Sequence, residues 1–264
     1  MQKKVQPRIL PGFMELLPQD QIVFNQMYDT IRRVYERFGF LPLDTPVIEF
    51  SDVLLAKAGG ETEKQIYRFQ KGDTDLSLRF DLTVPLARYV AQRYNDLVFP
   101  FKRYQMSKVF RGERPQKGRF REFYQLEKIG AQAVSEELLD LGVSESGIEQ
   151  ILNFVMLNGS NTEILTQLQS LSDDVVFAEG VAELQTVITA LGQFGIPEQN
   201  YKIDLTIARG LDYYTGTVYE TMLNDYPKLG SICSGGRYDN LTGYYTDQHL
   251  PGIGISIGLT RLYF

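Results

Sequence analysis

The sequence has 264 residues, a formal net charge of −6 and 43% hydrophobic residues. This size and composition suit one large soluble domain, or one domain with a smaller insertion, and the acidic balance argues against general coating of nucleic acid. Cys233 is the only cysteine, which excludes an internal disulfide and fits a reducing compartment. We expect a cytoplasmic protein without a membrane partner, because no secretory signal opens the chain and no stretch approaches the roughly 20 apolar residues of a membrane span.

The first 50 residues predict a helix followed by an extended segment. Asp20 is a plausible N-cap for a helix that runs to about Phe38, because apolar residues recur at helical spacing at Val23, Met27, Ile31 and Tyr35. Residues 40–50 are extended and interrupted by Pro42 and Pro46, which is typical of an edge or interface strand.

A hairpin and a second helix are expected next. Residues 66–69 and 76–80 alternate around a glycine turn and predict two paired strands. Asp81 then precedes a helix that holds Pro85 in its first turn and runs to about Arg93. Asp81 either caps this helix or holds an ammonium group together with Thr83, and the spacing favours neither alternative.

A basic segment follows in this acidic chain. Residues 108–122 hold six cations and two acids, a local charge of +4, around a loop that Pro115 and Gly118 punctuate. Beyond the loop, one strand face carries Arg119, Arg121, Phe123 and Gln125. Arginine forks suit phosphate oxygens, so a polyanion could dock here. The alternative is a solvated basic hairpin.

The second half of the chain predicts a helical insertion and then more strands. Residues 127–195 carry almost no strand signal, and they predict helices at 127–141, 144–157, 160–171 and 177–194. Strands are expected at 201–207, 217–222, 230–237 and 252–258, the last of which opens a helix at residue 259. Because hairpins dominate and strand–helix alternation is absent, we expect an α+β fold with a mainly antiparallel sheet flanked by helices.

Several chemistries lack the residues that they need. The single histidine, His249, lies in a polar loop and forms no base–nucleophile pair, so we expect a surface histidine. Cys233 beside two glycines fits a small buried residue better than a nucleophile. The sequence contains no zinc-ligand spacing, no P-loop and no dinucleotide-binding fingerprint.

Five segments together carry a resemblance. Residues 110–125 and 253–261 match motifs 2 and 3 of the class II aminoacyl-tRNA synthetases, and the strand around Pro46 is similar to motif 1, the dimer-interface element. Residues 208–216 and 234–239 resemble the two histidine-specific signatures, which select the histidyl-tRNA synthetase family. The resemblance covers almost the whole chain. It implies histidine, ATP with Mg²⁺ and tRNA(His) as substrates, a homodimer, and no assigned side-chain metal ligand.

The resemblance implies an ATP-binding set and a histidine-binding set. Arg111 would grip the α-phosphate of ATP and Arg261 the γ-phosphate, while Glu113 and Arg119 would also face ATP. The ammonium group of histidine would be held by Asp81, Thr83 and Gln125, and the imidazole would face Tyr214 and Tyr213. Arg209 would approach both the α-phosphate and the histidine carboxylate, and would partly replace a metal ion.

Catalysis in this family would need no side-chain nucleophile. The histidine carboxylate attacks the α-phosphorus of ATP, pyrophosphate leaves, and a tRNA ribose hydroxyl later takes the histidyl group. The catalytic residues Arg209, Arg111 and Arg261 would act by positioning and by stabilising phosphoryl charge.

Two departures from the family pattern define the expected domains. The catalytic domain would comprise residues 1–125 and 199–264, the helical insertion residues 126–198, and the family's anticodon-binding domain has no counterpart. In the family, motif 2 continues into a strand, a helix and a second strand before the insertion. Several dozen residues are therefore expected to be missing between Gln125 and Leu126.

A paralogue of the family offers an alternative function. It serves as a non-catalytic regulatory subunit of ATP phosphoribosyltransferase, and it too lacks the anticodon-binding domain. Such paralogues typically lose part of the motif 2 loop or the arginine at the position of Arg209, and this chain retains both. The synthetase is therefore favoured.

Overall fold

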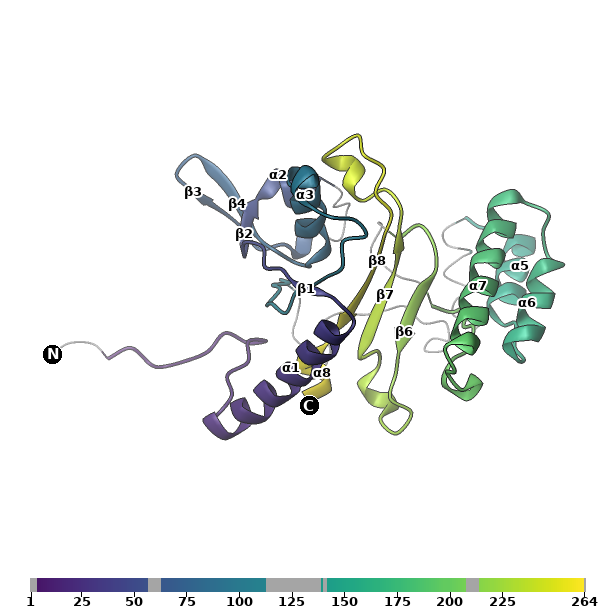
Figure 1. The fold of residues 1–264 in the computed structure, drawn as a ribbon, viewed down its shortest axis with the longest axis horizontal. Helices are drawn as coiled ribbons and strands as arrows, with labels where there is room; N and C mark the ends of the chain where they lie inside the picture. The colour runs from purple at the N-terminus through teal and green to yellow at the C-terminus, as the bar shows by residue number, and fades with distance from the viewer. Residues whose placement is uncertain (1–3, 57–62, 113–138, 140–141, 208–213, 264) are drawn as a thin grey trace. The chain divides into compact units, whose positions relative to one another are not determined.

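The computed structural model describes residues 4–56, 63–112, 139, 142–207 and 214–263 (Figure 1). The chain divides into two compact units: unit 1 holds residues 1–122, 221–234 and 240–264, and unit 2 holds residues 123–220 and 235–239. Unit 2 thus contains the expected insertion together with residues 235–239 of the second segment that resembles a histidine-specific signature. The domain boundaries at residues 125 and 198 stay a prediction.

Helix α1 spans Pro18–Arg37 and begins earlier than expected. The prediction of Asp20 as N-cap was wrong: Leu17 occupies that position without a side-chain bond, and Pro18 starts the helix. Proline suits the first helical position because its fixed φ is already helical and its missing N–H would have had no partner. Asp20 lies in the first turn, where a negative charge favours the helix dipole. The helix ends before Gly39, whose φ of +75° reverses the chain.

A three-stranded antiparallel sheet has the order β2-β4-β3, with β2 at Ile48–Phe50, β3 at Arg68–Lys71 and β4 at Thr74–Leu78. The expected hairpin is confirmed, with Phe69 opposite Leu76 and Gly72 in the turn at a φ of +61°. Helix α2, Ser51–Leu55, follows β2 directly. Buried Ser51 and Ser77 hydroxyls bond each other at 2.8 Å, which joins α2 to β4.

Helix α3 spans Thr83–Gln92 and packs on this sheet through an ion pair. Arg88 donates to Glu49 of β2 at 2.8 Å, and the Glu49 side chain is only 7% exposed. The pair β1, Leu41–Pro42, and β5, Arg103–Tyr104, runs parallel. Apart from this short pair, the antiparallel α+β architecture is confirmed.

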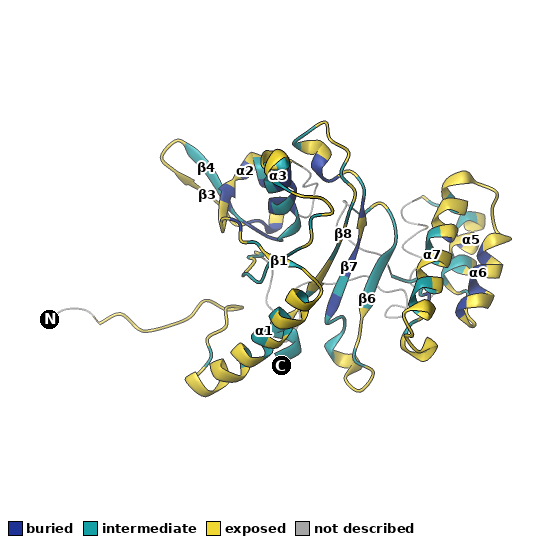
Figure 2. Cartoon of the chain, in the orientation of Figure 1, coloured by how far each residue is buried: buried dark blue, intermediate teal, exposed yellow. Residues whose placement is uncertain are grey.

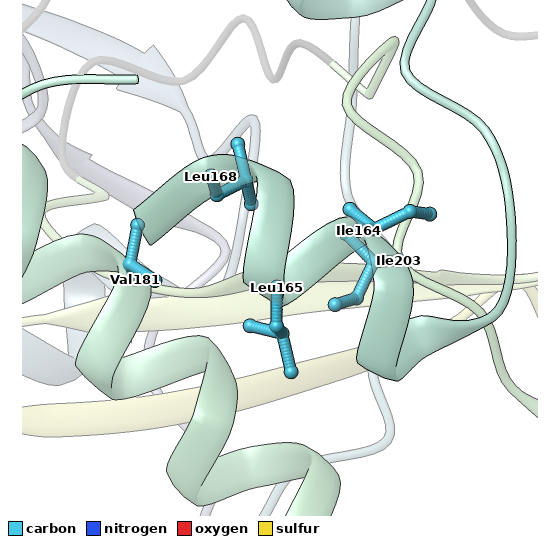
Figure 3. Close-up of a cluster of buried hydrophobic side chains, with 5 residues drawn as sticks. All are labelled: Ile164, Leu165, Leu168, Val181 and Ile203. Atoms are coloured by element: carbon cyan, nitrogen blue, oxygen red, sulfur yellow. The ribbon is translucent and has the colours of Figure 1, made fainter. Parts of the chain in front are cut away.

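Unit 2 contains three helices that begin at their own side-chain caps: α5 at Glu145–Val155, α6 at Asn161–Gln169 and α7 at Val175–Gln193. Ser144, Ser160 and Asp174 each accept a first-turn N–H, and Ser160 forms a complete capping box with Glu163. The core of the unit joins α6, α7 and Ile203 (Figure 3). Three of the four helices predicted in this region, at 144–157, 160–171 and 177–194, are confirmed. The fourth, at 127–141, lies outside the described residues except for residue 139.

The strand expected at residues 201–207 was wrong. The carbonyl of Tyr201 accepts from Asn161 Nδ2 at 3.3 Å, and the N–H of Ile203 donates to Asn161 Oδ1 at 2.8 Å. One buried amide side chain at the start of α6 therefore satisfies the backbone groups that a strand neighbour would have bonded.

The last sheet has the order β6-β7-β8, with β6 at Val218–Thr221, β7 at Cys233–Tyr238 and β8 at Gly252–Ile257. All three were predicted, as was the helix that follows β8, α8 at Leu259–Tyr263. Short 3₁₀ turns lie at Glu63–Gln65, Tyr94–Asp96, Glu198–Asn200, Pro227–Leu229 and Thr242–Tyr244.

One helix in the described part of the chain, α7, is long and apolar enough to cross a membrane by length and composition. Its mean hydropathy over 18 residues is 1.4, so the expectation that no stretch approaches a span was wrong by this criterion. One such helix is weak evidence, because core helices pass the same test. Phe177, Val181, Leu184 and Ile188 of α7 belong to the core of unit 2.

Candidate active site

The start of the basic segment lies beside the end of β4. The N–H of Phe110 donates to the carbonyl of Arg79 at 2.9 Å, and the Arg111 Nε donates to the carbonyl of Phe80 at 3.0 Å. Asp81 comes next in the chain and is only 6% exposed. Arg111, a predicted ATP ligand, is thereby bonded to the residue directly before Asp81, a predicted ligand of the histidine ammonium group. Thr83, a second predicted ligand of that group, begins α3.

The anchored Nε fixes the orientation of the Arg111 side chain. Guanidinium groups carry five donors in a planar fork, so one bond at Nε leaves the outer nitrogens for a bidentate contact with an anion. Arg111 is half-buried, which strengthens such a contact relative to one in bulk water. The arrangement can bind a phosphate group close to a buried carboxylate.

Buried Arg79 stabilises the backbone that leads to this site. It is 2% exposed, its Nε donates to the carbonyl of Lys108 at 2.9 Å, and its Nη1 reaches the carbonyl of Thr45 and the Asp44 carboxylate. Two other chain segments, residues 44–45 and residue 108, thus converge on one guanidinium. We infer that Arg79 holds the strand that leads into Arg111.

Asp81 makes the helix-capping contact that its position predicted. Its Oδ1 accepts the N–H of Val84 at 3.1 Å, in the first turn of α3. Tyr245 lies within the field of this carboxylate, and its hydroxyl donates to the carbonyl of Val53 at 2.8 Å. Burial first, and then the charge of Asp81, raises the pKa of Tyr245 to about 12. Leu82 occupies the N-cap position of α3 without a side-chain bond, so Asp81 bonds the first turn from one residue before the cap. Its contact with an ammonium group stays a prediction.

Arg261 lies in α8, directly after the glycine-alternating strand β8. Its Nη1 donates to the carbonyl of Ser231, and the N–H of Gly258 donates to the carbonyl of Ile232 at 2.8 Å. The end of β8 and the start of α8 are therefore fastened to residues 231–232. This anchoring positions the Arg261 side chain independently of the Arg111 contact.

Unit 2 holds the two segments that resemble the histidine-specific signatures, and it joins them directly. The N–H of Thr215 donates to the carbonyl of Arg237, and the N–H of Arg237 donates to the carbonyl of Thr217, both at 3.0 Å. The Thr215 hydroxyl donates to Asp239 Oδ2 at 2.7 Å. Hydrogen bonds thus join residues 215–217, which follow Tyr214 in the chain, to residues 237–239.

The Tyr214 ring lies against the backbone of Gly236. A Cβ placed on Gly236 would be 2.6 Å from Tyr214 Cδ1 and 3.0 Å from Val218 Cγ1. Only glycine leaves room for the ring in this position. Gly236, Arg237 and Asp239 belong to the segment 234–239 but were not predicted individually, although the adjacent glycines 235 and 236 were a signal of close backbone approach.

Replacing Gly236 by alanine should therefore displace Tyr214. We expect the Michaelis constant for histidine in ATP–pyrophosphate exchange to rise at least about tenfold, because a small misplacement of a contact group strongly weakens its interaction. Gly180→Ala is the matched control, since no atom lies within 4 Å of a Cβ at that position in α7. Equal histidine constants for the two variants would contradict the assignment of Tyr214 to the histidine site.

Five predicted site residues lie outside the described residues: Glu113, Arg119, Gln125, Arg209 and Tyr213. Among the residues that the structure describes, no group of three or more His, Cys, Asp or Glu side chains could hold a metal ion. A pocket in unit 1 is lined by Glu49, Phe50, Val53, Arg88, Ala91, Gln92 and Tyr245, none of which is a predicted site residue. His249 is exposed and Cys233 is buried, as expected.

Comparison with known proteins gives consistent matches. The family model described as histidyl-tRNA synthetase matches residues 12–143 and 130–262. Histidine–tRNA ligase of Clostridium tetani is 54% identical over 327 positions, covering 98% of this chain and 74% of the relative. That of Xanthomonas campestris is 42% identical over 354 positions, with the same coverage of 98% and 74%.

Solved structures are also similar. Histidyl-tRNA synthetase from Nostoc sp. PCC 7120 matches with a TM-score of 0.83 and 38% identity, covering 98% of this chain and 75% of that one. An ATP phosphoribosyltransferase regulatory subunit/histidyl-tRNA synthetase from Bacillus halodurans matches with a TM-score of 0.78. At 20% identity, with coverage of 98% and 83%, the second match shows the fold alone.

The length of the first alignment bears on the expected gap after Gln125. It spans 327 positions although the chain has only 264 residues, so at least 63 positions of the relative, the difference of these numbers, have no counterpart here. The two family-model matches also overlap, at residues 130–143. An internal segment of the relatives is therefore missing from this chain, and its location between Gln125 and Leu126 stays a prediction.

Proposed function

The chain belongs to the histidyl-tRNA synthetase family, and we propose that it is the catalytic core of a histidine–tRNA ligase. It activates histidine with ATP to histidyl-adenylate and transfers the histidyl group to tRNA(His). The observation that supports this most is the anchoring of Arg111 on Phe80, which sets a phosphate-binding fork beside the carboxylate of Asp81.

The proposed first step joins histidine to the α-phosphate of ATP. A histidine carboxylate oxygen attacks the α-phosphorus, the bond to the bridging oxygen breaks, and pyrophosphate leaves with that electron pair. Arg111 and Arg209 neutralise the charge that develops on the α-phosphate, and Arg261 holds the γ-phosphate within the leaving group. Preorganised cations of this kind are the main source of catalysis in phosphoryl transfer.

The proposed second step transfers the histidyl group to tRNA. A ribose hydroxyl of the terminal nucleotide attacks the carbonyl carbon of the adenylate, and AMP leaves. No side chain forms a covalent bond in either step. Glu113 and Arg119 contact ATP in the motif 2 loop, and Mg²⁺ enters with ATP on its phosphates, as magnesium commonly does.

Histidine is recognised at its two ends. Asp81, Thr83 and Gln125 accept hydrogen bonds from its ammonium group, while Tyr214 and Tyr213 face its imidazole. Asp81 is buried between the end of β4 at Leu78 and the start of α3 at Thr83, and the N–H of Val84 holds its carboxylate in place. The fixed ring of Tyr214 over Gly236 supports the assignment of the imidazole end.

A homodimer is part of the proposal. The segment that resembles motif 1 exposes large apolar side chains: Leu41 is 61% exposed, Ile48 47% and Phe50 57%. Helix α1, next to it in sequence, has no buried residue and is mostly exposed (Figure 2). A second copy would cover such apolar surface. A cytoplasmic location is likewise proposed, supported by the single cysteine, Cys233, which is buried and cannot form a disulfide within the chain.

The second candidate function is that of a regulatory subunit. We keep it as an alternative because the chain shares its fold with the Bacillus halodurans protein. Calorimetric titration of histidine with and without Mg²⁺–ATP separates the two functions. The synthetase function predicts histidine binding that ATP strengthens, because Arg209 contacts both the α-phosphate of ATP and the carboxylate of histidine. Histidine binding of equal affinity in the two titrations would favour the regulator.

A further inference from the structure

Glu183 lies in the middle of α7, and its carboxylate reaches the turn that follows Tyr214. Oε2 accepts the N–H of Thr217 at 3.2 Å and lies 3.3 Å from the Thr217 hydroxyl. Oε1 lies 3.9 Å from the Arg237 Nε. A residue of the helical insertion thus contacts both segments that resemble the histidine-specific signatures, all within unit 2.

The helix presents this carboxylate rigidly. Val181, two residues before Glu183, is 6% exposed and packs in the core with α6, and Leu184 packs against the same core. Glu183 therefore projects from a part of α7 that is packed against the core of unit 2. A side chain held in this way loses little further rotamer freedom when it bonds to the turn.

The turn is shaped to receive the carboxylate. A Cβ on Gly216 would lie 2.7 Å from Glu183 Oε2 and 3.0 Å from Arg237 Cδ. The bare backbone of Gly216 thus permits the contact between Glu183 and Thr217. The Arg237 Nε also donates to Asp239 Oδ1 at 3.0 Å. The positive charge of Arg237 therefore attracts the carboxylates of both Glu183 and Asp239 to the turn.

Any movement of this turn reaches Tyr214. Thr215 and Thr217 are bonded to the backbone of Arg237, next to Gly236, and Gly236 leaves just enough room for the Tyr214 ring. A shift of Thr217 away from β7 would loosen both bonds and release the ring. Contact geometry within a few tenths of an ångström is what a binding site must preserve.

We propose that Glu183 is a positioning residue for histidine recognition, which clamps residues 215–217 onto β7 and so holds Tyr214 over Gly236. This inference rests on the proposed function, in which Tyr214 faces the imidazole. The helical insertion then contributes directly to the amino-acid site. The Glu183 carboxylate itself touches neither substrate.

The test compares Glu183→Ala and Glu183→Gln in the full chain by ATP–pyrophosphate exchange. For Glu183→Ala we expect a Michaelis constant for histidine about tenfold higher, because a hydrogen bond to a charged acceptor is lost. The constant for ATP and the turnover number at saturating histidine should stay within about twofold, since no phosphate contact changes. Glu183→Gln keeps an acceptor oxygen, so its effect should be about two- to threefold.

Two further variants keep the test decisive. Glu179→Ala, one turn earlier on the same helix and exposed, should match the wild type. Gly216→Ala should push the carboxylate away from Thr217 and raise the histidine constant, and its effect should not add to that of Glu183→Ala. Comparing Gly216→Ala with Glu183→Ala tests the role of the carboxylate even if one of these variants lowers the melting temperature.

The outcomes separate the inference from the proposed function. Wild-type chain without histidine-dependent exchange would overturn the proposed function and the inference with it. Active wild type together with an unchanged histidine constant in Glu183→Ala and Gly216→Ala would overturn the inference alone. Equal rises in the constants for histidine and ATP would also overturn it, because they would indicate a general structural role.

Discussion

Replacing Arg111 by alanine should lower the rate of histidine-dependent ATP–pyrophosphate exchange by about 10²–10³-fold, the usual effect of removing one preorganised charge from a reacting centre. The fold should survive, because Arg111 is only half-buried and its hydrogen bond to the carbonyl of Phe80 lies at a partly exposed site. ATP–pyrophosphate exchange assays on the purified variant measure the rate, and circular dichroism measures whether it is folded.

Arg111→Lys sharpens this prediction. A lysine ammonium is a point charge and cannot donate to the Phe80 carbonyl while it also grips a phosphate with a planar fork. We expect Arg111→Lys to recover only a small part of the lost rate. Lys102→Ala removes an exposed cation from the same part of the chain and should leave exchange within about twofold. Full activity of Arg111→Lys would contradict the bidentate role.

Replacing Arg209 by alanine should abolish histidine-dependent exchange. Arg209 lies outside the described residues, and its role follows from the resemblance of residues 208–216 to a histidine-specific signature. It would contact both reacting groups, the α-phosphate and the histidine carboxylate, so its loss should exceed the effect of a single-contact residue, about 10²–10³-fold.

The control for Arg209 is a cation on the preceding segment. Lys202 is 69% exposed and pairs with Asp204 at 2.8 Å, so Lys202→Ala should leave exchange nearly unchanged. Thermal unfolding of Arg209→Ala should match the wild type within a few degrees. Near-normal exchange by a folded Arg209→Ala variant would contradict the catalytic role assigned to this signature.

Local signals in the sequence predicted most elements of the fold. The helices predicted at 144–157, 160–171 and 177–194 begin at the caps Ser144, Ser160 and Asp174, and Gly72 lies in the turn of the predicted hairpin. These features depend on a few neighbouring residues, and so sequence carries them.

The errors came from partners far away in the chain. Residues 201–207 alternate as a strand does, yet the Asn161 side chain, 40 and 42 residues earlier, takes the bonds of Tyr201 and Ile203. The β1–β5 pairing is parallel and joins residues 62 apart, Leu41 and Arg103. No local pattern specifies such a partner.

The candidate site divides in the same way. Arg111 and Asp81 were predicted from their motifs, and the structure brings them together through the carbonyl of Phe80. Glu183 could not be predicted, because it lies in a helix whose pattern marks it only as a polar position, 34 residues from Thr217. Gly236 had a signal in the glycine pair, but only the position of Tyr214 explains why it must be glycine.

The most direct test of the central claim is exchange of labelled pyrophosphate into ATP by the wild-type chain. The account predicts incorporation that requires histidine and Mg²⁺–ATP, that needs no tRNA, and that no other amino acid supports. Such exchange reports reversible formation of histidyl-adenylate, the step assigned to Arg111, Arg209 and Arg261. Histidine binding without any exchange of pyrophosphate would contradict the account and would favour the regulatory function.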